Sequence, residues 1–311
     1  MQAEIIGVMS GSSLDGLDIA LCTIAEQEDH ITCTLSNATT IPFPSSIAIQ
    51  LSTAPSMSGF DLMKIDADFG KFIGEQVKKW LVQNDLRADY IASHGHTVFH
   101  EPALGFTTQI GSGSQIAFAT GIDTITDFRN ADIASGGQGA PFAPAADTKL
   151  FPGYNAYLNL GGIANINIIS SDGQHKAWDL GPCNQALNHL AKKTGKPFDK
   201  DGAIGASGSA KQKVVMDLIS MFPYEDGNPK GLSNDSIQRL WLSYLEKSKE
   251  EVADLMASAV EAIATLVISH SAPLMPKEGR VLITGGGAHN SFLIESIRRK
   301  ASEFSINFHL P

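Results

Sequence analysis

Residues 5–24 read IIGVMSGSSLDGLDIALCTI. The apolar and β-branched residues of Ile5–Met9 and Leu17–Ile24 predict two strands. Between them, Ser10–Gly16 is rich in Ser, Gly and Asp, the residues that adopt turn conformations most readily. This stretch therefore predicts a β-hairpin whose turn is built from small polar residues.

A second stretch repeats this pattern near the middle of the chain. Residues 156–169 read AYLNLGGIANINII and predict a strand, a Gly161-Gly162 turn and another strand. Strands alternate with helices elsewhere, which indicates an α/β protein. The repeat and the length of 311 residues predict two like domains, 1–130 and 131–311, whose glycine turns meet at an interdomain cleft.

Several helices are predicted from apolar spacing and from capping signals. One runs from Asp66 to Gln83, and another from about Asn290 to Lys300. The clearest begins at Ser248, which is expected to form a capping box with Glu251. Pro182 is expected as the first residue of a further helix, a position that proline favours.

Composition narrows the class of protein. A net charge of −10 argues against nucleic acid as a partner, because binding phosphates along a strand needs a basic surface. The N-terminal residues lack a signal-peptide pattern, and no apolar run approaches the roughly 18 residues of a membrane span, so we expect a cytoplasmic protein without a membrane partner. The three cysteines are expected to be free thiols.

The turn of the first hairpin has the composition of a phosphate-binding loop. Its small residues allow close approach of a polyphosphate to backbone N–H groups, and the hydroxyls of Ser10, Ser12 and Ser13 add donors. Asp15 or Asp18 could hold Mg²⁺, directly or through water. The segment is not a P-loop, since no Gly-Lys-Ser/Thr follows. An ordinary hairpin turn is the alternative interpretation.

Two further glycine turns could contact a nucleotide. Gly161-Gly162 is a weak signal by itself, because Gly-Gly hairpins are common. Gly285-Gly286-Gly287 lies between a predicted strand and a helix, which suits a nucleotide lying across the turn. Asn290 replaces the last glycine of a dinucleotide-binding fingerprint, so an NAD site is disfavoured. A plain tight turn remains the alternative at each place.

Asp179 lies where a predicted strand gives way to a helix. A carboxylate at the mouth of an α/β sheet suits a general base. The alternative is that Asp179 caps the helix that Pro182 would begin.

Polar residues also cluster at 93–100 and 127–139. His94 and His96 invite a zinc site, but no further pair of ligands accompanies them, so contacts to a polar substrate are favoured. Arg129 could clamp a carboxylate with its guanidinium group. Its alternative role is a salt bridge to Asp127 or Asp132.

Taken together, the motifs resemble one family, the anhydro-N-acetylmuramic acid kinases. The segments that carry the resemblance are GVMSGSSLDGLD at 7–18, ASHGHTVFH at 92–100, DFRNADIASGGQGAPFAP at 127–144, NLGGIANIN at 159–167, WDLGPCN at 178–184 and LITGGGAHN at 282–290. Their order and context match over nearly the whole chain. The resemblance implies the actin-like ATPase fold of two ribonuclease H-like domains, a homodimer, and the ATP-dependent conversion of 1,6-anhydro-N-acetylmuramic acid to N-acetylmuramic acid 6-phosphate.

The resemblance also implies roles for individual residues. Asp179 would be the catalytic base, and His96, Thr97, Arg129, Asp132 and Gln138 would line the sugar site. The expected contacts to ATP are Gly11, Ser12, Ser13, Leu14, Asp15, Gly16, Leu17, Asp18, Gly161, Gly162, Gly285, Gly286, Gly287 and Asn290, with Mg²⁺ at Asp15 and Asp18.

The chain departs from the family pattern at several places. His96 stands where Gln is usual, Ser12 replaces Thr, and NPKGLSN at 228–234 is a degraded form of a Pro-Lys-Ser-Thr-Gly stretch. The family normally continues beyond Pro311 with a helix that carries an acidic residue. Two alternatives therefore stand beside the kinase hypothesis: another sugar kinase of the same fold, and a non-catalytic nucleotide-gated sugar sensor.

Overall fold

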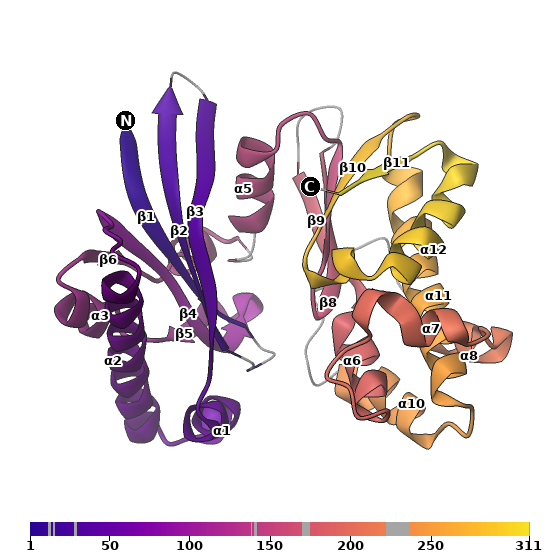
Figure 1. The fold of residues 1–311 in the computed structure, drawn as a ribbon, viewed down its shortest axis with the longest axis horizontal. Coiled ribbons are helices and arrows are strands. Elements are labelled where there is room, and N and C mark those ends of the chain that lie inside the picture. Colours follow the sequence, from indigo (N-terminus) through magenta and orange to yellow (C-terminus); the bar gives the residue numbers. More distant parts are fainter. Residues whose placement is uncertain are drawn as a thin grey trace. The chain divides into compact units, whose positions relative to one another are not determined.

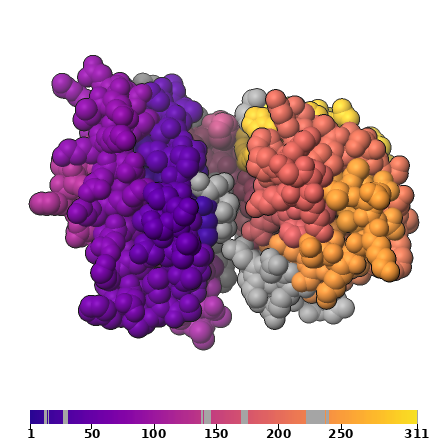
Figure 2. Space-filling view, turned by 60° about the horizontal axis from the view of Figure 1, so that its bottom comes forward, coloured from indigo at the N-terminus to yellow at the C-terminus, as the bar shows by residue number. Residues whose placement is uncertain are grey.

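The structure, a computed structural model, describes residues 1–11, 14, 16–27, 30–137, 139, 142–169, 175–221 and 237–310. The chain forms two compact units, Met1–Leu150 and Phe151–Pro311. In the space-filling view the colours of the two halves of the sequence do not intermix (Figure 2). The division falls 20 residues after the boundary expected at 130/131, because α4 (Asn130–Ala134) packs on β5 and α5 (Phe142–Leu150) on β3.

Unit 1 is built around a sheet whose strands all come from the first 125 residues of the chain (Figure 1). Its strands are β1 (Gln2–Ser10), β2 (Gly16–Gln27), β3 (His30–Pro42), β4 (Tyr90–Glu101), β5 (Phe106–Ile110) and β6 (Asp123–Ile125). Besides α4 and α5, its helices are α1 (Ser45–Thr53), α2 (Gly59–Gln83) and α3 (Gly113–Thr120).

Alternation of side chains sets which face of this sheet is buried. Leu17, Ile19 and Leu21 of β2 are almost fully buried, because every second residue of a strand points to the same face. The apolar face of α2, with Phe69 and Ile73, belongs to the same core. This helix begins at Gly59, seven residues before the predicted start, and Ser58 caps it by accepting the Asp61 N–H at 3.1 Å.

The strand order of unit 1 is β3-β2-β1-β4-β5, and β6 also pairs with β4. β1, β2 and β3 are antiparallel neighbours, whereas β4 runs parallel to β1. β6 pairs with Tyr90–Ala92 of β4, and β5 pairs with His96–Glu101 of the same strand. The sheet therefore forks between β5 and β6 at Ser93–Gly95, and we call this place the fork.

Unit 2 repeats this architecture with different helices (Figure 1). Its strands are β7 (Ala156–Leu160), β8 (Ile163–Ile169), β9 (His175–Pro182), β10 (Arg280–Thr284) and β11 (Asn307–His309). Its α-helices are α6 (Asn184–Lys192), α7 (Ala203–Ser207), α8 (Gln212–Ser220), α10 (Ser243–Lys247), α11 (Val252–Ser271) and α12 (Ser291–Ala301), and a π-helix spans Gln238–Leu242.

The order in unit 2 is β11-β10-β7-β8-β9. Here too the three strands that come first in the sequence, β7, β8 and β9, are antiparallel neighbours. β10 pairs in parallel with β7, and β11 pairs in parallel with β10. Each unit thus has an antiparallel three-strand meander whose first strand pairs in parallel with the fourth. This duplicated arrangement is that of the ribonuclease H-like domains of actin-like ATPases, so the predicted fold class is confirmed.

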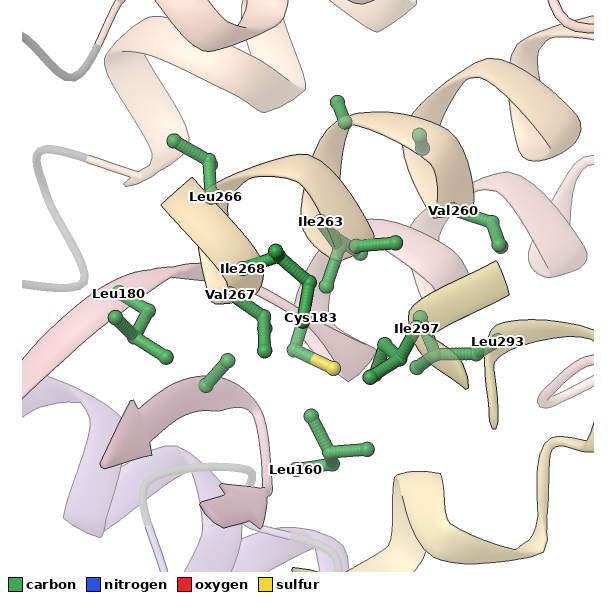
Figure 3. Packing of buried hydrophobic residues seen from close by; sticks show 14 of the residues in the cluster. Leu160, Leu180, Cys183, Val260, Ile263, Leu266, Val267, Ile268, Leu293 and Ile297 are labelled. Atoms are coloured by element: carbon green, nitrogen blue, oxygen red, sulfur yellow. The ribbon is translucent and has the colours of Figure 1, made fainter. Parts of the chain in front are cut away.

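Helix α11 is the centre of the second core. Ile263, Leu266 and Val267 of this helix belong to one buried cluster with Leu160 of β7 and Leu293 of α12 (Figure 3). The predicted capping box is wrong: α11 is capped at Glu251 without a side-chain bond, and Ser248 ends α10. The two helices are separate because Ser248 and Glu251 both have extended backbone.

The described part of the chain contains one helical segment, Val252–Leu274, that is long and apolar enough to cross a membrane. The expectation concerned an uninterrupted apolar run, and polar residues such as Asp254, Ser258 and Glu261 interrupt this helix. Of its most apolar window 67% is buried inside unit 2, as in the core helix of a globular domain.

The three cysteines are free thiols in the structure, as predicted. Cys183 lies in the unit 2 core beside Ile263 and Val267 (Figure 3), where burial raises the pKa of its thiol to about 12. Partial burial, with the nearby Cys33, raises the pKa of Cys22 to about 11. Cys33 is exposed.

Alkylation rates should follow the exposure of the three thiols, and the raised pKa values of Cys22 and Cys183 should slow these two further. We expect iodoacetamide to modify Cys33 first, Cys22 more slowly and Cys183 only after unfolding, because the thiolate is the reactive form. Peptide mass spectrometry of samples quenched over time gives the three rates, and the same reaction in denaturant is the control. Labelling of native Cys183 as fast as Cys33 would contradict the described core.

Candidate functional site

The turn between β1 and β2 is described at Gly11, Leu14 and Gly16, whereas Ser12, Ser13 and Asp15 lie outside the described residues. Leu14 has a positive φ of 57°, and its N–H donates to the Gly11 carbonyl at 3.3 Å. A Cβ at Gly16 would lie 2.7 Å from the Ile41 carbonyl oxygen. Gly16 is thus required by the close approach of β2 and β3, whatever ligand the turn binds.

Two neighbours in this motif have different environments. The side chain of Leu17 belongs to the unit 1 core, so only its backbone could contact a ligand. Asp18 is exposed on β2, and one of its carboxylate oxygens accepts the Thr40 hydroxyl at 2.6 Å. No cluster of three or more His, Cys, Asp or Glu side chains that could hold a metal occurs among the described residues.

His96 lies in the sheet directly beside β1. Its Nδ1 is 3.1 Å from the Ser10 hydroxyl, and both side chains are buried. Burial lowers the pKa of His96, so the ring is held in its neutral form. Thr97 is exposed next to it and accepts a weak bond, at 3.4 Å, from the Gln109 amide.

Arg129 and His94 form a bonded pair that fixes one tautomer of the imidazole. The Arg129 Nε–H donates to His94 Nε2 at 3.0 Å, so this nitrogen must carry a lone pair. His94 Nδ1 lies 3.0 Å from the Gly95 carbonyl and must donate its proton there. His94 is therefore neutral, and burial, followed by Arg129, lowers its pKa accordingly.

The segment after α4 is folded around Asp132. Its Oδ2 accepts the Gly139 N–H at 2.7 Å, and its backbone carbonyl accepts the Gly137 N–H at 2.8 Å. The Gly139 carbonyl in turn accepts a bond from Arg129 Nη1 at 2.8 Å. Asp132 thus positions the loop that holds Arg129, and within the described chain Arg129 forms no salt bridge to Asp127 or Asp132. Gln138 lies outside the described residues.

A pocket of about 420 Å³ opens at the fork of the unit 1 sheet. Although sequence analysis noted the polar segments 93–100 and 127–139, which contain Ser93 and Asp127, it gave no ligand role of their own to the polar side chains that line this pocket, apart from His94. They include Asp66, Ser93, Thr108, Gln109, Thr126 and Asp127. A composition signal was present, since 107–114 reads TTQIGSGS, but nothing in the sequence indicates that this segment faces Ser93. The pocket shares His94 with the Arg129 pair.

In unit 2, Asp179 lies within β9 and not at a helix start. Pro182 is the last residue of that strand, where its missing N–H ends the ladder, and α6 begins at Asn184. The expectation that Pro182 begins a helix is therefore wrong, and Asp179 is no N-cap. It is half-buried and directly opposite Asn165 in the sheet.

Strand register extends this pair into a polar row. Asn165 is opposite Asn159, and Asn159 is the neighbour of Thr284 on β10. All four residues of the row are half-buried, while the residues that alternate with them, such as Leu158 and Leu160, belong to the core. The row therefore lies on the sheet face opposite the core. Alternation of Asn with apolar residues in NLGGIANIN was the sequence signal for this face.

The turn Gly161-Gly162 is bonded to the start of α6. The Gly161 carbonyl accepts the Asn184 N–H at 3.1 Å, and the Gly162 carbonyl accepts the Cys183 and Gln185 N–H groups at 2.9 and 3.1 Å. These bonds satisfy N–H groups at the helix start that would otherwise lack partners. The first N–H groups of α6 are thus occupied by the turn and not open to an anion.

The third glycine turn lies against the end of β7, the strand that leads into the second turn. A Cβ at Gly285 would be 2.3 Å from Asn159 Oδ1, and one at Gly287 would be 2.9 Å from the Leu160 carbonyl oxygen. Gly285 also has a positive φ of 81°. A 3-10 turn over Gly286–His289 follows. Only glycine permits this approach, which places the third turn next to Asn159 of the polar row.

Asn290, predicted to contact the nucleotide, is the N-cap of α12. Its Oδ1 accepts the Leu293 N–H at 3.0 Å, and the residue is 7% exposed. A Cβ at Gly202 would lie 2.3 Å from the same oxygen. The Asn290 carboxamide oxygen is therefore committed to the helix.

Comparison with known proteins decides the family. A family model described as anhydro-N-acetylmuramic acid kinase matches residues 3–308. The chain belongs to this family. It is 34% identical over 304 residues to the anhydro-N-acetylmuramic acid kinase of Paramagnetospirillum magneticum, covering 96% of this chain and 84% of the relative. The enzyme of Pseudomonas putida is 33% identical over 301 residues, with coverage of 93% and 82%.

Solved structures are more distant. Component A of the Acidaminococcus fermentans (R)-2-hydroxyglutaryl-CoA dehydratase matches with a TM-score of 0.47 and 10% identity, over 98% of this chain and 91% of that one. The ROK hexokinase of Thermus thermophilus matches with a TM-score of 0.39 and 15% identity, over 100% and 93%. The fold assignment stands on the strand order of the two units.

The His94–Arg129 pair should make part of the stability depend on pH. The folded pKa of His94 lies below its ordinary value of 6.5, so on acidification the unfolded chain takes up a proton that the folded chain resists. The contribution is complete above about pH 7.5 and is lost as the pH falls through the ordinary histidine range.

We expect the melting temperature of wild type to approach that of His94→Gln as the pH falls from about 7.5 to 5.5. Gln keeps an acceptor for Arg129 but does not titrate. Comparison with the variant cancels the opposite effect of Asp66 and Asp147, whose pKa values burial raises. A gap that is constant over this range would show that His94 is not held neutral.

Proposed function

We propose that this chain is an ATP-dependent kinase that acts on 1,6-anhydro-N-acetylmuramic acid in cell-wall recycling. It would open the anhydro bridge and phosphorylate O6, giving N-acetylmuramic acid 6-phosphate and ADP. The observation that carries the proposal is the family match over residues 3–308, which spans every glycine turn and the Asp179 strand. The polar row of unit 2 contains the carboxylate of Asp179, which can accept a proton. In unit 1, Arg129 can bind a carboxylate.

The reaction requires two bond changes at O6 of the sugar. Water attacks the anomeric carbon, a new C1–O bond forms, and the C1–O6 bond breaks. O6 then attacks the γ-phosphorus of ATP, and the bond from that phosphorus to the bridging oxygen breaks to release ADP. The attacking water must lose a proton, and Asp179 is the residue that we assign as its general base.

Asp179 is suited to this role by its place in the sheet. Asp179 belongs to β9, and its backbone is paired with β8 opposite Asn165. The strand pairing therefore fixes the position from which the carboxylate extends. It shares a sheet face with Asn159, which lies against the Gly285 turn. The proposed base and the two proposed nucleotide turns of unit 2 therefore belong to one sheet.

ATP would be held mainly by backbone N–H groups, since the chain has no P-loop lysine. In unit 2 these are the turns at Gly161-Gly162 and Gly285–Gly287, and in unit 1 the hairpin turn at Gly11. Mg²⁺ fits the exposed carboxylate of Asp18, because this ion prefers oxygen ligands and usually keeps several waters. When bound, Mg²⁺ would screen the phosphate charge.

Arg129 is assigned to the carboxylate of the sugar's lactyl group. Among the described residues, His94 and Gly139 use two of its five N–H groups, and we assign the others to the anion. Burial lowers the pKa of Arg129, but an arginine remains charged at neutral pH.

We also infer a cytoplasmic homodimer, on the family resemblance alone.

Asp179→Asn tests the base. Asn keeps the size and hydrogen bonding of Asp but cannot accept the proton, so turnover should fall at least ~10²-fold while ATP affinity is retained. ADP release coupled to a dehydrogenase measures turnover, and calorimetry measures ATP binding. Near wild-type turnover in this variant would remove Asp179 from the mechanism.

Isotope placement gives an independent check of the chemistry. In ¹⁸O-water the label should enter the anomeric hydroxyl of the product, and the transferred phosphate should stay unlabelled. Label in the phosphate would show that water attacks ATP and that the chain is an ATPase.

Arg129→Ala tests recognition of the carboxylate. Loss of a hydrogen bond to a charged group should weaken binding of the muramic substrate by about 1.5–3 kcal/mol. The anhydro-sugar of N-acetylglucosamine lacks the lactyl group and is the matched control ligand. Competition assays with both sugars measure the difference, and equal losses would make Arg129 a structural residue.

A further inference from the structure

The fork of the unit 1 sheet contains two buried polar atoms without partners in the described structure. They are Ser93 Oγ and Gln109 Oε1. Ser93 is 0% exposed, and both residues line the pocket of about 420 Å³. A buried polar group without a partner is unfavourable, so its presence in a pocket indicates a missing ligand group or water.

Ser93 lies where the strand pairing of β4 changes from β6 to β5. β6 pairs with β4 only up to Ala92, and β5 begins to pair at His96. Gly95, with φ of 71°, passes so close to β5 that a Cβ would lie 2.4 Å from the Ile110 carbonyl oxygen. The strands therefore leave an opening between them.

The orientation of Gln109 follows from its neighbour Thr107. The Thr107 hydroxyl donates to the Phe99 carbonyl at 3.0 Å, so its oxygen can only accept further bonds. It accepts from Gln109 Nε2 at 2.8 Å, which fixes the carboxamide. Oε1 therefore points away from Thr107 as an acceptor that lacks a donor.

The rest of the pocket combines two carboxylates with several hydroxyl groups, which can both donate and accept. Asp66 accepts the Gly111 N–H at 2.7 Å on one carboxylate oxygen. Asp127 accepts bonds from Thr126 and Asn130. Neither Lys nor Arg lines the described pocket, so an anion is disfavoured. A neutral ligand that brings hydroxyl or amide donors fits this set.

The pocket adjoins residues already assigned to the sugar. His94 lines it and binds Arg129, and Gln109 donates to Thr97 at 3.4 Å. We propose that Ser93 and Gln109 bind the neutral donors of the sugar, its hydroxyl and acetamido N–H groups, and so determine specificity for an amino-sugar. This inference rests on the proposed function and adds the second side of the sugar site to the Arg129 side.

Ser93→Ala separates this role from a structural one. If the free protein carries an unpaired hydroxyl, its removal should raise the melting temperature, by about 2–4 °C for a domain of this size. The same variant should raise the KM for 1,6-anhydro-N-acetylmuramic acid by roughly 3- to 10-fold, the value of one neutral hydrogen bond, with the KM for ATP unchanged.

Ser296→Ala is the matched control. Ser296 Oγ of α12 is likewise buried without a partner, but it lies in the core of unit 2 and lines neither described pocket. This variant should also raise the melting temperature, yet leave both KM values unchanged. The pair thus distinguishes removal of an unsatisfied hydroxyl from removal of a ligand contact.

Three outcomes would overturn the inference. A lower melting temperature for Ser93→Ala would mean that the hydroxyl has a partner in the free protein. An unchanged KM for the sugar would mean that the pocket holds only water. A wild type without sugar-dependent turnover would refute the proposed function and this inference with it, whereas an active wild type with an unaffected variant refutes the inference alone.

Discussion

The close approach of the Gly285–Gly287 turn to the end of β7 is the constraint on which the arrangement of unit 2 depends. Gly285 and Gly287 lie so near Asn159 and Leu160 that a single Cβ would overlap backbone or side-chain atoms. This contact places the end of β10 beside the end of β7, and Gly161-Gly162 then anchors α6 through three backbone bonds. The position of the polar row follows from the ladder, because strand register fixes which residues are neighbours.

Unit 1 depends on a different kind of constraint, a chain of polar bonds. Asp132 holds Gly139, Gly139 holds Arg129, and Arg129 holds a neutral His94. Each bond in this chain has a defined donor and acceptor, so removal of one member leaves another buried group unsatisfied. The two units thus reach a defined site by different means, one by close packing of backbone and the other by hydrogen bonds.

Sequence patterns predicted the features that depend on local spacing. The apolar face of α2 and the two hairpins were predictable because periods of 3.6 and 2 are properties of the chain itself. The fork was not predictable, since tertiary packing decides which part of β4 pairs with β6 and which part pairs with β5. The unpaired state of Ser93 is likewise a property of the fold. Pro182 was misread because a proline that ends a strand and one that begins a helix look alike in sequence.

The strand order of unit 2 has a consequence for its synthesis. β7 emerges from the ribosome long before β10, its parallel neighbour, at Arg280–Thr284. At about 5–20 residues per second, a separation of this length corresponds to several seconds or more. α11 emerges within that interval, before β10, β11 and α12 exist to cover it. The nascent chain therefore exposes its most apolar helix for seconds, which makes this segment the natural target of a chaperone during translation.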